Sequence, residues 1–265
     1  MAGQININSD MGESFGRWRL GSDAELMRFV PTINVACGFH AGDPHVMRRT
    51  VELAVEAGVP EIGGHPSLPD VLGFGRRRML IEADELRDLL MYQVGALQAF
   101  ARAAGRTLSH LKPHGALYAM CGEREDLALA LLETARALDP ALTVIAGGPA
   151  MAAAAAATGV RAVPEGYVDL AYRPDGFPVL ERAKRAWDPR EVADRAVRIV
   201  RERRLPAIDG TTVAIDVPTV CIHGDVPNAV DVARCVRERL AAESIEVVPL
   251  ARAAAPAAPT PRQRS

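Results

Sequence analysis

Short apolar runs alternate with longer stretches of helical periodicity along most of this 265-residue chain. Seven of the apolar runs have the length, and the bounding glycine, proline and polar residues, that are typical of buried strands. These predicted strands are Gln4–Asn8, Thr32–Ala36, Val59–Gly63, Leu108–Lys112, Leu142–Ala146, Val160–Pro164 and Thr219–Ile222.

The segments between the predicted strands carry signals that start and stop helices. Ser22 and Glu25 have the spacing of a capping box, and Asp43 followed by Pro44 is typical of an N-cap and a first helical position. Gly58 would end the helix that begins at Pro44. Further helices are predicted over residues 82–104, 127–138, 189–203 and 228–241.

Alternating strands and helices predict parallel strands that are joined by right-handed crossovers. About seven such units favour an α/β fold, a TIM-like (β/α) barrel with seven strands, and an open doubly wound sheet is the alternative. The length fits one barrel domain over residues 1–250. The Ala/Pro-rich residues 251–265 have no apolar periodicity and are predicted to be disordered. The long connections 69–79 and 171–188 are expected to form lids over a site.

Composition and charge narrow the classes of function. The chain has 31 basic and 33 acidic residues and a net charge of −2, which is not the balance of a nucleic-acid-binding domain. It has neither an N-terminal secretory pattern nor an apolar run near the ~20 residues that cross a bilayer. The 4 cysteines show no paired spacing, so we expect reduced thiols. We therefore expect a cytoplasmic protein that acts on neither nucleic acid nor membrane.

The candidate chemistry lies at the carboxyl ends of the predicted strands. In a parallel barrel these ends ring one mouth, so residues that are distant in sequence become neighbours there. Six strands end in polar clusters, and most of the histidines lie in or beside them, which predicts one small-molecule site. The clusters are NSDMGE (8–13), NVACGFHAGD (34–43), GGHPS (63–67), KPHG (112–115), EGYVD (165–169) and HGD (223–225).

Several kinds of reaction are possible at a site formed by these strand ends. Histidines and carboxylates transfer protons near neutral pH, and Lys112 is placed to stabilise negative charge. Asp10 with His40 and His65 would instead suit a divalent metal such as zinc or manganese, although no HExxH motif supports one. A nucleophilic Cys37 or Cys221 is a further alternative. The sequence contains neither a P-loop nor a GxGxxG fingerprint, and the turn at 147–149 is most simply the start of a helix.

Seven motifs make the chain resemble the LamB/YcsF family, and they run in order along nearly its whole length. The matching pieces are NSDMGE, NVACGFHAGD, the Gly63–Arg76 stretch, YQVGAL, HLKPHGALY, the Glu165–Gly176 segment and CIHGD. The resemblance implies a barrel of the glycoside hydrolase/deacetylase type. It also implies one component of an ATP-hydrolysing 5-oxoprolinase, which cleaves 5-oxo-L-proline to L-glutamate together with two partner subunits of B and C type.

This implied activity agrees with the residues themselves. A five-membered lactam is a resonance-stabilised amide, so opening it needs an activating step. A chain without a nucleotide motif fits activation by partners, with ATP as a cofactor of the complex, followed by ring opening at this barrel. The chain departs from the family pattern where Val168-Asp169-Leu170 replaces Ala-Asp-Arg and Val179-Leu180-Glu181-Arg182 replaces Val-Pro-Arg-Ser. Another lactam is therefore left open as the substrate.

In this scheme one of the histidines works with Asp10 or Asp169 to activate water, while Lys112 steadies phosphoryl or carboxylate oxygens. The expected catalytic residues are Asp10, His40, His65, Lys112, His114, Asp169 and His223. The expected substrate-binding residues are Asn8, Glu13, Asn34, Asp43, Glu165, Tyr172 and Asp225. A divalent metal is left open. The competing hypotheses are a stand-alone, metal-dependent amidohydrolase or deacetylase and a non-catalytic subunit that positions a partner.

Overall fold

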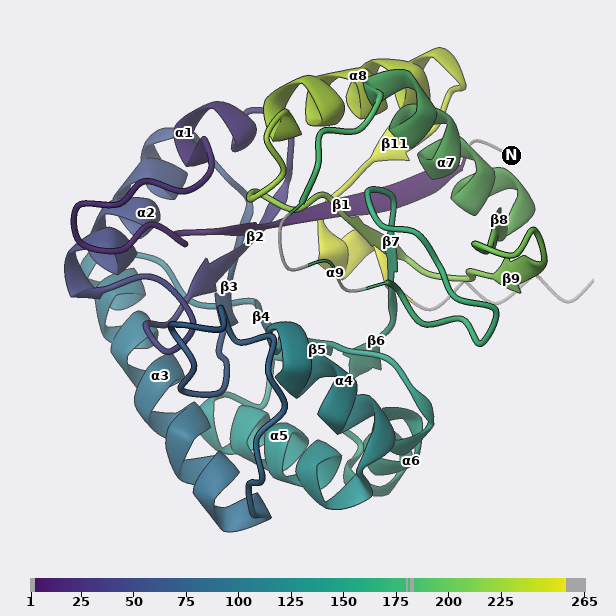
Figure 1. Ribbon diagram of the computed structural model, residues 1–265. Coiled ribbons are helices and arrows are strands. Elements are labelled where there is room, and N and C mark those ends of the chain that lie inside the picture. Colours follow the sequence, from purple (N-terminus) through teal and green to yellow (C-terminus); the bar gives the residue numbers. More distant parts are fainter. Residues whose placement is uncertain (1–2, 180, 182–183, 256–265) are drawn as a thin grey trace, which may run out of the picture.

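The computed structural model describes residues 3–179, 181 and 184–255, and a ring of parallel strands forms its centre (Figure 1). Neighbouring strands follow the order β6-β5-β4-β3-β2-β1-β10-β7, and every pair in this order is parallel. These strands are β1 (Gln4–Met11), β2 (Thr32–Ala36), β3 (Glu61–His65), β4 (His110–Leu111), β5 (Thr143–Ile145), β6 (Ala162–Val163), β7 (Glu165–Tyr167) and β10 (Thr219–Cys221).

The first and last strands of this order are consecutive in the chain and are separated only by Pro164. Ala162 pairs with Val144 of β5, whereas Glu165 pairs with Thr219 of β10. Proline has no backbone N–H to donate, so it interrupts the ladder there. One segment thus supplies both β6 and β7, and the chain itself closes the ring. The TIM-like α/β barrel is confirmed. Seven of its eight strands overlap the predicted ones, and β7, directly after the predicted strand Val160–Pro164, was not predicted.

Helices cover the outside of the ring (Figure 1). They are α1 (Asp23–Leu26), α2 (Pro44–Glu56), α3 (Ala83–Ala103), α4 (Gly115–Glu123), α5 (Glu125–Leu138), α6 (Pro149–Thr158), α7 (Pro189–Glu202), α8 (Ala229–Ala242) and α9 (Leu250–Ala253). The Asp43 carboxylate caps α2 by accepting from the N–H groups of His45 and Val46. Ser22 precedes α1, but its side chain makes no cap hydrogen bond, so the predicted capping box is wrong.

Besides β7, the sequence did not predict helix α4 and four smaller elements. Strands β8 (Arg204–Pro206) and β9 (Thr212–Ala214) form an antiparallel hairpin beside the barrel, and β11 (Glu246–Val247) pairs with β1. Helix α9 covers residues that were expected to begin a disordered tail, while residues 256–265 of that tail lie outside the described residues.

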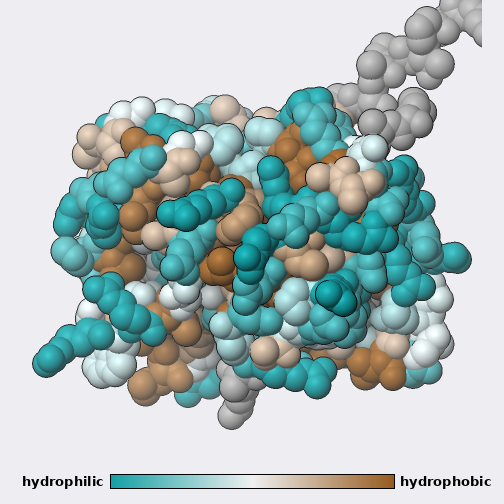
Figure 2. All heavy atoms as spheres, turned by 90° about the horizontal axis from the view of Figure 1, so that it is seen from above, coloured by the Kyte–Doolittle hydropathy of each residue, from teal (hydrophilic) through white to brown (hydrophobic). Residues whose placement is uncertain are grey.

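One face of the molecule is mostly polar. On the face shown in Figure 2, hydrophilic residues predominate and apolar residues lie in small separate groups. None of the helices in the described part of the chain combines the length and the apolar character that crossing a bilayer requires.

The inside of the barrel is polar, unlike the branched apolar layers that usually fill such barrels. Side chains alternate between the two faces of a strand, so Asn6, Asn8 and Asp10 of β1 share the inner face. The Asn6 amide donates to Thr32 Oγ1 at 2.8 Å and accepts from Thr219 Oγ1 at 2.7 Å. These bonds satisfy the buried groups and tie three strands together.

Glu61 seals the amino-terminal end of the barrel. Its buried carboxylate accepts a 2.6 Å hydrogen bond from Thr32 Oγ1, and it also accepts from the backbone N–H groups of Leu250 and Ala251 at the start of α9. The chain's last described helix therefore covers the end opposite the mouth.

A glycine pair tests this interior packing. A Cβ on Gly63 of β3 would lie 2.2 Å from His110 Nε2, whereas a Cβ on Gly95 of α3 would meet nothing within 4 Å. Gly63→Ala should therefore lower the free energy of unfolding by about 1–3 kcal/mol, because overpacking displaces a buried ring. Gly95→Ala should raise it by about 0.5–1 kcal/mol, because alanine favours helix. Urea unfolding of both variants checks this, and equal effects would contradict the packing argument.

Candidate active site

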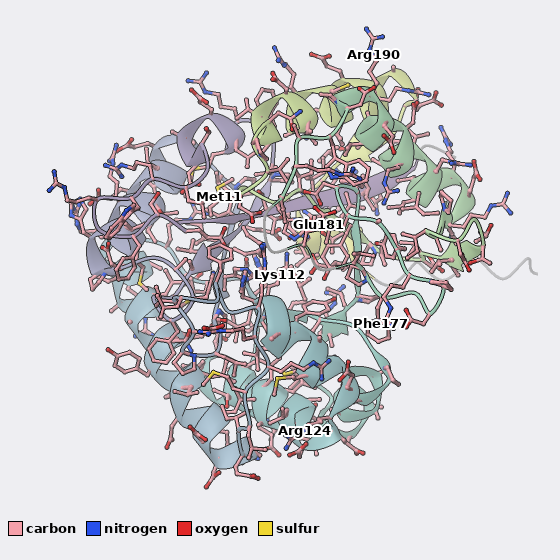
Figure 3. All side chains as sticks on the ribbon, viewed as in Figure 1. Met11, Lys112, Arg124, Phe177, Glu181 and Arg190 are labelled. Carbon is pink, nitrogen blue, oxygen red and sulfur yellow. The ribbon has the colours of Figure 1, made fainter. Side chains whose placement is uncertain are left out.

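A cavity of about 330 Å³ opens at the carboxyl ends of the strands. Lys112 lies close to the middle of the molecule, with Glu181 near it, whereas Arg124 and Arg190 lie at the edge (Figure 3). Residues from strand ends and from both long connections line the cavity. They include Asp10, His65, Arg76, Lys112, His114, Tyr118, Tyr167, Glu181, Lys184 and His223.

The Lys112 ammonium, which is 3% exposed, is the centre of a buried polar network. Its Nζ lies 2.9 Å from Asp10 Oδ1 and 3.1 Å from Glu165 Oε2. It also lies 3.2 Å from both Asn8 Oδ1 and Cys221 Sγ. Three N–H groups thus face four acceptors, so the ammonium is engaged by the protein itself.

This network fixes the charge of its members. Burial alone would raise the pKa of Asp10, but the neighbouring His65 and Lys112 hold it well below the usual range. Burial alone would likewise lower the pKa of Lys112, yet the charge of Asp10 in particular holds it well above its ordinary value. The pair therefore stays ionised inside the barrel.

Beneath this pair lies an amide–imidazole layer. Asn34 Nδ2 donates to Asn8 Oδ1 and to Asp10 Oδ1, both at 2.8 Å. Asn34 Oδ1 lies 2.7 Å from His110 Nε2, which must therefore carry the ring proton, since an amide oxygen only accepts. Burial, together with the Lys112 charge, lowers the pKa of His110 to about 3. His110 is thus a neutral structural donor that orients Asn34.

On the β1–β4 side of the mouth, three histidines and one carboxylate meet. His40 Nε2 lies 3.1 Å from Glu13 Oε1, and the ring of His40 stacks on that of His114 with 3.7 Å between centroids. His65 Nε2 lies 2.9 Å from His114 Nδ1 and 3.4 Å from Asp10 Oδ2. Burial is the largest cause that lowers the pKa of both His40 and His114 well below the usual range.

On the opposite side, Asp169 orients His223. Its Oδ1 lies 2.8 Å from His223 Nδ1, and its Oδ2 accepts from the His223 backbone N–H at 2.8 Å. Burial alone would raise the pKa of Asp169, but His223 lowers it below the usual range. A carboxylate on Nδ1 places the proton there and leaves the Nε2 lone pair of this cavity-lining ring as a base. The Tyr167 ring stacks on His223 with 5.7 Å between centroids.

The two long connections meet over the cavity. Arg76 Nη2 lies 2.8 Å from Asp225 Oδ2, and Arg76 Nη1 donates to the Glu181 carbonyl at 2.9 Å. Lys184 Nζ lies 2.9 Å from Asp225 Oδ1. Asp225 therefore pairs with one cation from each of the two long connections.

Most predicted site residues come together around the cavity, but two do not. Asp43 caps α2 and also accepts from the Gly16 N–H, so its carboxylate is already used in the backbone. Tyr172 is buried, with its hydroxyl accepting from the Tyr167 N–H at 2.6 Å, and it lines a neighbouring cavity. Asn8, Asn34 and Glu165 lie beneath the cavity and hold the residues that line it.

Several cavity residues were not predicted from the sequence. Tyr118, Tyr167, Arg76 and Lys184 were not candidates, although the first three lie within motifs that carried the resemblance. Lys184 had no signal, because only the fold of the long connection brings it to Asp225.

Neither candidate cysteine is prepared for nucleophilic attack. Burial raises the pKa of Cys37 to about 12 and that of Cys221 well above its ordinary value. Both thiols therefore stay protonated at neutral pH, and the thiolate is the reactive form.

A closed (β/α) barrel with paired carboxylates, histidines and cations at its mouth defines an α/β-barrel protein with an enzyme-like site. The sequence matches the LamB/YcsF family over residues 5–255, and the chain belongs to that family. It is 44% identical over 250 residues to a protein from Pyrococcus furiosus that is named as the A-type subunit of 5-oxoprolinase, covering 93% of this chain and 98% of that one. A protein of the same name from Nocardia farcinica is 46% identical, with 92% and 98% covered.

Solved structures support the same relationship. A structure described as a lactam utilization protein from Thermus thermophilus matches with a TM-score of 0.84 and 40% identity, covering 92% of this chain and 98% of that one. A putative cellobiose-phosphate cleavage protein from Enterococcus faecalis shares the fold, with a TM-score of 0.58 and 13% identity over 94% and 98% of the chains.

The neutral His110 predicts a pH dependence of stability. Its folded pKa of about 3 lies below the ordinary ~6.5, so in this window the unfolded chain takes up a proton that the folded chain does not. Stability should be full above pH ~6.5 and fall as the pH drops, by up to about 1.4 kcal/mol per pH unit for this group. His110→Gln, which keeps a donor for Asn34, should make the slope between pH 6 and 5 shallower by about that amount.

Urea unfolding across this pH range measures the slope. His45→Gln, on the exposed side of α2, is the matched control and should leave it unchanged. An identical slope for His110→Gln would mean that His110 is protonated in the folded protein.

Proposed function

We propose that this chain is one component of an ATP-dependent 5-oxoprolinase and opens the ring of 5-oxo-L-proline, giving L-glutamate, in the cavity at the barrel mouth. The observation that carries the proposal is the arrangement of that cavity. An oriented histidine, His223, lines the cavity together with Arg76 and Lys184, two cations that are held by Asp225. The names of the relatives, which refer to 5-oxoprolinase and to lactam utilization, support the choice of substrate.

The chemistry explains why ATP is needed. Transfer of a phosphoryl group from ATP to the lactam carbonyl oxygen makes the ring carbon electrophilic. Water then adds to that carbon, the C–N bond breaks as the nitrogen takes a proton, and the γ-carboxyl phosphate is left. A second water releases phosphate and completes L-glutamate.

The residues divide these tasks. His223, with Asp169 behind it, takes the proton from the attacking water and returns it to the ring nitrogen. Arg76 and Lys184 hold the substrate carboxylate or the phosphoryl oxygens. Lys112, which the sequence suggested for that role, holds Asp10 and Glu165 in place.

ATP and the partners belong to the same proposal. The chain has no P-loop, so we assign phosphorylation to two partner subunits of B and C type in the cytoplasm. The deciding experiment measures glutamate release from 5-oxoproline with and without ATP, for this chain alone and mixed with its partners. We expect glutamate only with ATP and partners. No glutamate from a folded, complete mixture would reject this substrate and direct the assay to other lactams.

Two variants test the His223–Asp169 pair within the complex. Asp169→Asn and His223→Gln should each lower kcat by about 10²–10⁴-fold, which is the usual contribution of a positioned base. His45→Gln serves as the control and should keep full activity. Full activity in His223→Gln would instead favour a subunit that only positions its partners.

A stand-alone, metal-dependent amidohydrolase is the second candidate, favoured by the cluster of Glu13 with three histidines. This enzyme would need a metal ion but no ATP. Glutamate or another amine product would therefore form without ATP, and a chelator would abolish product formation.

A further inference from the structure

Four buried donors lie together on the β1–β4 side of the mouth, in the residues Glu13, His40, His65 and His114. One ligand atom from each lies within 4.8 Å of all the others. None of the four residues is more than 6% exposed. They reach one place from four different strand ends, so the barrel, not a local sequence motif, assembles the cluster.

Hydrogen bonds to carbonyl oxygens fix the protons of two of these rings. His65 Nδ1 lies 2.7 Å from the Lys112 carbonyl, and His114 Nε2 lies 2.8 Å from the Phe74 carbonyl. A carbonyl only accepts, so each of these nitrogens carries its ring proton. In neutral rings the two remaining nitrogens, His65 Nε2 and His114 Nδ1, therefore face each other at 2.9 Å with lone pairs.

Such a contact requires something positive between the nitrogens, either a proton or a cation. Glu13 lies beside this pair, with its buried carboxyl oxygen 3.1 Å from His40 Nε2 and 3.7 Å from His114 Nδ1. His40 Nδ1 is itself buried with no hydrogen-bond partner among the described residues. A proton shared between His65 and His114 would satisfy their contact but would leave His40 Nδ1 without a partner among the described residues, whereas a cation can be bound by all four residues.

We infer that Glu13, His40, His65 and His114 form a binding site for a divalent transition-metal ion of the zinc type. Three imidazoles and one carboxylate are a donor set that zinc prefers. Ligands 2.0–2.1 Å from a tetrahedral ion lie about 3.3 Å from each other. Three of the pairs in the cluster, at 2.9, 3.1 and 3.7 Å, bracket that value, and all pairs lie within 4.8 Å.

The surroundings of the cluster are those of a metal site. Ligating histidines usually donate their second N–H to a carbonyl or carboxylate, as His65 and His114 do here. Asp10 Oδ2, 3.4 Å from His65 Nε2, adds negative charge beside the cluster. His65 and His114 also line the cavity, so the ion would border the place where substrate binds.

The inference does not depend on the lactam chemistry and has its own readout. Chelator-treated full-length protein is titrated with Zn²⁺, and bound metal is measured by calorimetry and elemental analysis. We expect one equivalent, a rise in Tm on adding Zn²⁺, and no comparable effect of Mg²⁺, which prefers oxygen donors. Glu13→Gln and His114→Gln should each weaken Zn²⁺ binding by about 100-fold or more.

Two controls locate the ion. His45→Gln tests adventitious surface binding, and His223→Gln tests the second group of possible ligands, Asp10, Cys221 and His223. Both should bind Zn²⁺ like the parent chain. The inference would be overturned if the parent protein bound no Zn²⁺, or if folded Glu13→Gln bound Zn²⁺ as tightly as the parent does. A proton shared between His65 and His114 would then be the explanation of their contact. Should His114→Gln fail to fold, Glu13→Gln still decides, because it keeps the size of the side chain.

Discussion

A lysine ammonium buried in the middle of a barrel is the constraint on which the rest of this structure depends. Removing a charge from water costs several kcal/mol unless partners surround it. Here the partners of Lys112 come from β1, β7 and β10, so the cation requires those strands to close around it. The same residue's backbone carbonyl fixes the proton of His65. The charge of Lys112, the closure of the barrel and the orientation of His65 therefore depend on one another.

The need to surround the buried Lys112 ammonium with polar partners explains why the inside of the barrel is polar. Asparagines at positions 6, 8 and 34 pass hydrogen bonds from strand to strand beneath the ion pair, and His110 completes them as a neutral donor. A polar network that is fully bonded specifies one arrangement, whereas a partly bonded one is costly. Gly63 is required by the same hydrogen-bond network, because only a residue without a side chain leaves room for the His110 ring.

Much of the fold could be predicted from the sequence, because the hydrophobic period of a helix or strand and the residues that cap a helix are properties of the local sequence. Pro44 and Gly58 bounded α2 correctly, and strand-end polarity placed Asp10, His65 and His223 at one mouth. Helix α4 was missed because its apolar residues leave no polar stripe to give a period. Asp43 looked like a site residue because a carboxylate that caps a helix has the same local sequence as one that binds a ligand. Lys184 reaches Asp225 only through tertiary folding, which no local pattern encodes.

The site has two unlike halves, and the Lys112–Asp10 pair separates them. On one side, Glu13 and three histidines bring buried oxygen and nitrogen donors together, which suits holding a cation. On the other, Asp169 gives His223 a fixed proton on Nδ1 and a free base on Nε2, which suits moving a proton. An ionised Asp10 lies next to both halves, since it is 3.4 Å from His65 and has a carboxylate oxygen within 4.8 Å of a His223 ring nitrogen. A change in charge at one half must therefore be felt at the other through Asp10, so a cation bound among the histidines would alter the environment in which His223 acts.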